Sequence, residues 1–144
     1  KVIVHLFEDL HMPLHTGGKE GDYGGNGVKV DFFGKSSNLH KVFDYEIIQS
    51  SERPESEWIT HLTQGLSAEK IQKIQQGGLT KWVNDSHSIV PSMYKNLPPK
   101  RNGTIEISKE YVQFATPIIE QQMLFAGVRL AAFLNEVMAK VVID

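Results

Sequence analysis

Apolar residues recur at helical spacing along most of the chain. Intervals of three and four residues place apolar side chains on one face, which predicts amphipathic helices. One segment, residues 28–33, instead alternates apolar and polar positions, which predicts a short strand that forms half of a hairpin and turns at Gly34. The helices predicted before the last third of the chain cover residues 2–10, 38–49, 54–64, 67–76 and 79–94.

Turn and cap signals set the expected structure of the last third. A polar loop is predicted through residues 101–103, after the prolines that end the helix over residues 79–94. Thr116 followed by Pro117 predicts the start of a long final helix, because Thr is a good N-cap and Pro suits the first helical position. A short helix over residues 108–114 is expected before it. The expected fold class is therefore all-α, with a small β-hairpin and a glycine-rich loop over residues 16–27.

Composition indicates one globular domain without a strong charge. The chain has 144 residues, of which 40% are hydrophobic and 22% charged, and its net charge is −2. This balance excludes the strongly basic surface of a duplex-binding protein, and no apolar run approaches the roughly 20 residues that span a membrane. The chain opens at Lys1 directly into a helical pattern without an N-cap. We therefore expect residues 1–144 to be the C-terminal part of a larger domain, with the missing N-terminal part as a partner.

Histidine and aspartate recur at ligand spacing in the first third of the chain. His5 and Asp9 are four residues apart, and so are His40 and Asp44, so each pair lies on one face of its helix. His15 follows a proline that turns the chain back after the first pair. Because the sequence has no cysteine, any metal must be held by His and carboxylate ligands, which suit Zn, Mn, Fe or Ni. A single pair of this kind is usually a surface ion pair, but two pairs and a third His favour a metal site.

The expected complete site consists of His15, His40 and Asp44. Three protein ligands with one open position are typical of a catalytic zinc. His5 and Asp9 would be part of a neighbouring site whose other ligands lie outside the chain. The segment at residues 24–27 is by itself most simply a turn, but its place between the two ligand clusters favours contact with a substrate.

Three motifs follow one another in a characteristic order. They are His5-x-x-x-Asp9-x-His11-x-Pro13-Leu14-His15, then Gly24-Gly25-Asn26, then Asn38-Leu39-His40-x-x-x-Asp44. This order resembles the zinc-dependent single-strand-specific nucleases that are also 3′-nucleotidases. The segment Gln122-x-x-x-x-Ala126-Gly-Val-Arg-Leu-Ala131-x-x-Leu-Asn135 is similar to the C-terminal helix of that family. Trp82-x-x-Asp85-Ser86 also matches, although the family usually has Glu where Asp85 stands.

The resemblance implies the helical fold shared with zinc-dependent phospholipase C and a cluster of three zinc ions. His5 and Asp9 would hold buried zinc, with Asp9 bridging two ions and therefore the candidate catalytic residue. The third zinc would be held by the complete site. Gly25 and Asn26 match the loop that contacts the nucleotide, and His11 matches a position that supports ligands without binding metal.

The implied reaction is metal-assisted in-line hydrolysis of single-stranded RNA or DNA to 5′-phosphoryl products, with removal of phosphate from 3′-nucleotides. Tyr23 is a candidate platform for an unstacked base. The family is typically exported, which implies a secreted or periplasmic location.

Two other functions remain open on the sequence. A phospholipase C-like zinc hydrolase would share the fold, but there the second pair is His-x-x-x-Glu and follows the first cluster more closely. A non-catalytic zinc-binding fragment or pseudoenzyme would keep the ligands without the reaction. Four further residues are expected to be structural: the surface or capping histidines His61 and His87, and the core tryptophans Trp58 and Trp82.

Overall fold

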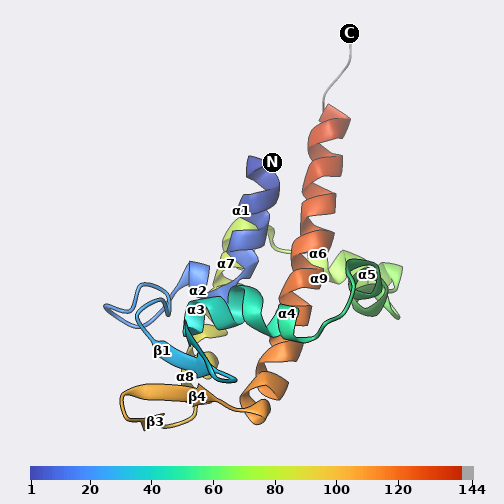
Figure 1. The fold of residues 1–144 in the computed structure, drawn as a ribbon. Helices are drawn as coiled ribbons and strands as arrows, with labels where there is room; N and C mark the ends of the chain where they lie inside the picture. The colour runs from blue at the N-terminus through green and yellow to red at the C-terminus, as the bar shows by residue number, and fades with distance from the viewer. Residues whose placement is uncertain (141–144) are drawn as a thin grey trace.

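The computed structural model describes residues 1–140 and contains helices arranged around one long C-terminal helix, with a small sheet at one end (Figure 1). The mainly helical fold predicted from the sequence is confirmed. The helical elements are α1 (Val2–His11), α2 (Pro13–Thr16), α3 (Leu39–Lys41), η1 (Val42–Glu46), α4 (Ile47–Ser50), α5 (Glu55–Thr63), α6 (Ala68–Gln75), α7 (Gly78–His87), α8 (Val90–Lys95) and α9 (Lys109–Lys140). None of the helices within the described part of the chain is both long and apolar enough to cross a membrane.

The sheet is larger than the predicted hairpin. Strands β1 (Lys29–Phe32) and β2 (Lys35–Asn38) form that hairpin, and β3 (Lys100–Arg101) and β4 (Thr104–Ile107) add a second. The strand order is β2-β1-β4-β3, with β1 parallel to β4 and both hairpins antiparallel. The prediction of a polar loop through residues 101–103 was wrong in its bounds, because the loop is shorter and Arg101 belongs to β3. Only Asn102 and Gly103 make the turn, both at positive φ, as a two-residue hairpin turn requires.

The helix predicted over residues 79–94 is two helices, α7 and α8. Pro91 lies in the first turn of α8, where the missing backbone N–H costs nothing. The hydropathy pattern continues across the break because Trp82, Val90 and Met93 all face the interior. Periodicity alone therefore did not reveal the break.

The final helix begins earlier than predicted. Thr116 is not its N-cap, because α9 begins at Lys109 and contains Pro117 within it. The Ser108 hydroxyl accepts a hydrogen bond from the Tyr111 N–H and starts the helix instead. Inside α9, the Thr116 hydroxyl donates to the Val112 carbonyl at 2.8 Å. The short helix expected over residues 108–114 is simply the start of α9.

The core lies between the sheet, α8, the helical run from α3 to α4, and the first half of α9. Its members are buried apolar side chains and include Val30, Phe32, Leu39, Val42, Phe43, Met93, Ile105, Ile107, Tyr111 and Ala115. The run from α3 to α4 has a π-helical middle turn, η1, a feature that frequently occurs at functional sites. This packing fixes the segments that carry the candidate ligands.

Candidate metal centre

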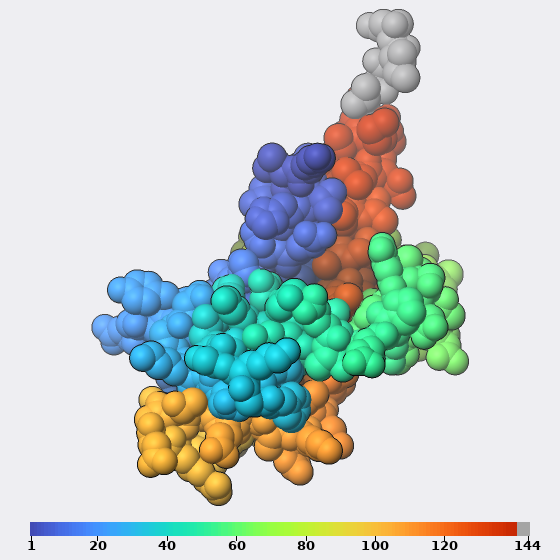
Figure 2. Space-filling model, viewed as in Figure 1, coloured from blue at the N-terminus to red at the C-terminus, as the bar shows by residue number. Residues whose placement is uncertain are grey.

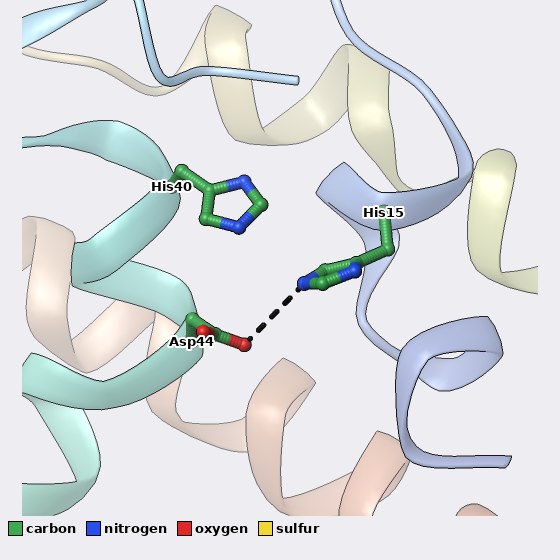
Figure 3. Close-up of side chains that lie close together, drawn as sticks. All are labelled: His15, His40 and Asp44. Atoms are coloured by element: carbon green, nitrogen blue, oxygen red, sulfur yellow. Dashed lines mark ion pairs between the residues drawn. The ribbon is translucent and has the colours of Figure 1, made fainter. Parts of the chain in front are cut away.

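Three of the predicted ligands converge on one point. Figure 3 shows His15 from α2, His40 from α3 and Asp44 from η1 pointing toward one another. One ligand atom from each side chain lies within 4.8 Å of the other two. The His15 Nε2 atom is 3.6 Å from Asp44 Oδ1, and the two imidazole rings have centroids 4.8 Å apart. Two imidazole nitrogens and one carboxylate oxygen, with the remaining side open, are a donor set that fits zinc.

Local sequence explains how these side chains meet. The Asn38 side chain accepts a hydrogen bond from the Lys41 N–H, which starts α3 and places His40 in its first turn. Asp44 follows one turn later on the same face. On the other side, Pro13 begins α2 directly after α1 ends, so the chain turns and His15 faces Asp44.

His5 and Asp9 lie beside this group, on α1. The Asp9 Oδ2 atom is 3.4 Å from His5 Nε2, and its Oδ1 atom is 3.4 Å from His15 Nδ1. Asp9 therefore stands between His5 and the group of His15, His40 and Asp44. The His5 side chain is 73% exposed, so the position that His5 and Asp9 share is open to solvent in the described residues.

The orientation of His40 is set by the glycine-rich loop. Its Nδ1 atom lies 2.9 Å from the Gly24 carbonyl oxygen. Because a carbonyl only accepts hydrogen bonds, Nδ1 carries a proton, and in the neutral ring the lone pair is then on Nε2. Zinc-binding histidines are commonly oriented by a hydrogen bond of this kind from the other ring nitrogen.

The predicted substrate loop has an inner and an outer part. Gly25 is buried, and its N–H donates to Asp22 Oδ1 at 3.1 Å. Asn26 is exposed and donates from Nδ2 to the Tyr23 carbonyl, and the Tyr23 residue is 84% exposed. A groove of about 510 Å³ runs from His15 along the loop past Tyr23 and Gly24. The Gly25 N–H is thus engaged within the loop, while the Tyr23 and Asn26 side chains face solvent.

His11 is 2% exposed, and both of its ring nitrogens are engaged. Nδ1 lies 2.7 Å from the Phe7 carbonyl oxygen, and Nε2 lies 3.0 Å from Arg129 Nη1. Burial lowers the pKa of His11 and the nearby Arg129 charge lowers it further, although the bond to Phe7 opposes this. A neutral His11 with both nitrogens engaged fits a supporting role and leaves no lone pair for a metal.

Two residues that support the site, Arg129 and Asp22, were not predicted from the sequence. Arg129 belonged to the C-terminal motif without an assigned role, yet its side chain is 4% exposed and reaches His11 from α9. A lone charged residue inside an apolar helical stripe was the signal that could have identified it. Asp22 follows the pattern of an Asp three residues before a glycine, which is typical of side-chain caps in turns.

The four residues expected to be structural make structural contacts. Trp58 and Trp82 are buried. His61 pairs with Glu120 at 2.8 Å, away from the ligand group. His87 donates to the Thr16 carbonyl at the end of α2, as a capping histidine does.

Comparison with known proteins supports the interpretation of these motifs. The family model described as S1/P1 Nuclease matches residues 1–139. This chain belongs to the S1/P1 nuclease family. Its similarity to Endonuclease 5 of Arabidopsis thaliana is 34% identity over 92% of the chain and 48% of that protein. It is 31% identical to Endonuclease 4 of the same plant, over 92% of the chain and 48% of that protein. Nuclease S1 of Aspergillus oryzae is 27% identical over 94% of the chain and 52% of its own length.

The S1/P1 match runs through all of the candidate ligands, which lie between residues 5 and 44. The chain spans about half the length of the curated relatives it matches. Asp85, in the Trp82 motif, has its carboxylate 2.6 Å from Lys81 Nζ and 3.5 Å from Arg129 Nη2. The motif therefore contacts the C-terminal helix through Arg129.

Proposed function

We propose that this chain carries most of the metal-binding half of a zinc-dependent phosphodiesterase. The enzyme would hydrolyse single-stranded RNA or DNA to 5′-phosphoryl products and remove phosphate from 3′-nucleotides. The observation that carries the proposal is the convergence of His15, His40 and Asp44 in a chain of the S1/P1 nuclease family.

The proposed ligand roles follow the geometry. His15, His40 and Asp44 would hold one zinc, through His40 Nε2 and an oxygen of Asp44. His5 and Asp9 would contribute to two further ions, with Asp9 as the bridging residue, since its two oxygens face in different directions. Bound zinc would supply Lewis acidity toward the phosphodiester.

The groove beside the ligands suits an unstacked nucleotide. Tyr23 presents an exposed ring in the groove that His15 also lines, and stacking of a base on such a ring favours single strands, whose bases are free. The exposed Asn26 amide lies close by and offers hydrogen-bond groups to a base. The net charge of −2 gives no broad basic surface, so we expect the metal site and stacking to provide most of the affinity.

The chain also presents an apolar face that a further part of the family domain would cover. Figure 2 shows α1 and the end of α9 projecting together from the body. Val2 and Leu6 of α1 are more than half exposed, and so is Met138 of α9. An exposed apolar face of this kind usually marks an interface.

A groove of about 430 Å³ continues this face between α1, η1 and α9. In its wall, the buried Gln122 Oε1 has no hydrogen-bond partner among residues 1–140. Because the relatives are about twice as long as the aligned region, we propose that the remainder of the family domain docks here and completes the His5 and Asp9 site. Hydrogen exchange tests this: α1 amides should exchange more slowly in the intact protein than in the 144-residue chain, and equal rates would contradict it.

Hydrolysis assays test the function itself. The intact protein should cleave single-stranded DNA and RNA, leave a duplex of the same sequence largely intact, and release phosphate from a 3′-nucleotide but not from its 5′ isomer. A chelator should abolish all three activities, and added zinc should restore them. Zinc-dependent hydrolysis of phospholipid with inert nucleic acid would instead support the phospholipase C-like alternative. Bound zinc with no hydrolysis of either substrate would support a pseudoenzyme.

Two further proposals depend on the family resemblance. The 24 residues between His15 and His40 contain the loop and β-hairpin, which favours a nuclease over the more compact spacing of phospholipase C. Export to a secreted or periplasmic location also stays a prediction, which fractionation of the native source would test.

A further inference from the structure

The glycine-rich loop is fastened at one side chain, Asp22. Its Oδ1 atom accepts the Gly25 N–H at 3.1 Å, and its backbone carbonyl accepts the Gly27 N–H at 2.8 Å. Its Oδ2 atom accepts the hydroxyl of Tyr94, in α8, at 2.5 Å. Asp22 thus connects the loop to a helix 72 residues further along the chain.

The loop in turn accepts two hydrogen bonds from His40. The Gly24 carbonyl accepts His40 Nδ1–H, and the Gly25 carbonyl accepts the His40 backbone N–H at 3.4 Å. Gly24 and Gly25 both have positive φ values, of 63° and 81°, so their peptide groups take orientations that other residues rarely adopt. A rotation of either peptide would turn the carbonyls away from His40.

The loop also packs closely against α2 and has no room to move toward it. A Cβ atom added to Gly24 would lie 2.3 Å from the Leu14 carbonyl oxygen. Leu14 directly precedes His15, so the loop packs against the backbone that carries one ligand while it bonds to another. Its position therefore bears on two of the three members of the candidate metal group.

The Asp22 carboxylate is suited to this task. Burial on its own would raise the pKa of Asp22, but the bonds from the Tyr94 hydroxyl and the Gly25 N–H lower it below the ordinary value. Burial and the bond to Asp22 also raise the pKa of Tyr94 above its ordinary value, so Tyr94 keeps its proton and donates it. An ionised acceptor can satisfy both donors at once, and bonds to a charged group are stronger than neutral ones.

We propose that Asp22, held by Tyr94, is a positioning residue that fixes His40 in the Nδ1–H tautomer and aims its Nε2 at the metal. The proposal rests on the proposed zinc function and deepens it, because it identifies what orients a ligand without touching metal or substrate. The glycine-rich loop then has two roles. Its Gly24 and Gly25 carbonyls orient His40, and Tyr23 and Asn26 are available to contact substrate.

Two conservative variants and one control test the proposal in the intact protein. Asp22→Asn keeps the shape but replaces one acceptor oxygen by an amide that can only donate. Tyr94→Phe removes one hydroxyl. Tyr111→Phe is the control, because the Tyr111 hydroxyl also makes a buried bond, to the Met93 carbonyl at 2.9 Å, but makes no hydrogen bond to the loop within residues 1–140. Each variant is examined by nitrogen-15 NMR of the His40 ring in zinc-free protein and by competitive zinc titration.

The expected results differ between the two loop variants and the control. Asp22→Asn and Tyr94→Phe should give His40 a mixture of tautomers and lower the zinc affinity of one site by about tenfold or more, the usual effect of losing a supporting partner. Tyr111→Phe should change neither. A single Nδ1–H tautomer with unchanged zinc affinity in Asp22→Asn would overturn the proposal, and so would a tautomer shift that leaves zinc affinity unaltered. If the wild type binds no zinc, the proposed function fails, while the tautomer measurement still decides whether the loop orients His40.

Discussion

The histidines around the candidate metal centre differ in what their two ring nitrogens contact. His11 bonds to a carbonyl and to Arg129, so neither nitrogen is free. His40 bonds through Nδ1 to the Gly24 carbonyl, which leaves Nε2 available to bind a metal. His15 lies between the carboxylates of Asp9 and Asp44, each within 3.6 Å of one of its nitrogens. At the scale of single residues, the roles of these side chains follow from these contacts and not from residue type.

The first prediction concerns His40 and a matched control. His40→Ala removes one of three protein ligands, so zinc affinity at one site should fall by more than the roughly 10–100-fold that loss of a supporting partner causes. His61→Ala removes a histidine that pairs only with Glu120 among the described residues, and zinc affinity should not change. Competitive titration with a chromogenic chelator measures both. Equal affinities in the two variants would contradict the assignment of His40.

The second prediction concerns pH and Asp22. The folded pKa of Asp22 lies below its ordinary value of 3.8, so the folded state binds this proton less readily than the unfolded chain does. The stability that Asp22 contributes is therefore present above about pH 3.8 and is lost as the pH falls through the folded pKa. Chemical unfolding of wild type and Asp22→Asn, both without zinc, should show a stability difference that is constant at higher pH and shrinks in acid. A pH-independent difference would contradict this account.

At the scale of elements, Arg129 joins helices that are distant in sequence. From α9 it donates to the Ile74 carbonyl near the end of α6, to His11 at the end of α1, and to Asp85 of α7. Its guanidinium also lies over the rings of Trp82 and Phe125. Because α1 carries His5 and Asp9, this network sets where that helix lies against α9.

The third prediction follows from that network. Arg129→Met should lower the free energy of unfolding by about 2–4 kcal/mol, because the His11 Nε2 and Ile74 acceptors lose their donor inside the protein. Lys81→Met is the control, since Lys81 binds the same Asp85 but is 56% exposed, and it should cost less than about 1 kcal/mol. Denaturant unfolding compares them. Similar losses in the two variants would show that the buried network adds little.

Sequence patterns predicted elements better than their ends. The i, i+4 spacing of His40 and Asp44 was sufficient to predict that they share a face, because helix geometry determines it. The start of α9 was misplaced at Thr116 because a Thr-Pro pair looks the same at an N-terminus and inside a helix that long-range packing stabilises. The bonds of Asp22 and Arg129 join positions dozens of residues apart, and no local spacing encodes such contacts.

At the scale of the whole molecule, the chain combines a candidate metal group with an exposed apolar face. His15, His40 and Asp44 lie next to the glycine-rich loop, while α1 and the end of α9 present exposed apolar residues. The motifs were specific enough to predict the family, since three such motifs in a fixed order rarely occur by chance. Zinc itself could not be fixed by spacing, because His and carboxylate sets suit several metals.

Zinc stoichiometry by plasma emission spectroscopy tests the central claim most directly. It is measured on the intact protein and on a double variant, His40→Ala with Asp44→Ala, after dialysis against zinc-containing buffer free of chelator. We predict about three zinc ions per wild-type chain and about one fewer in the double variant, because only the site formed with His15 loses its ligands. Absence of zinc from the wild type, or an unchanged count in the double variant, would contradict the account.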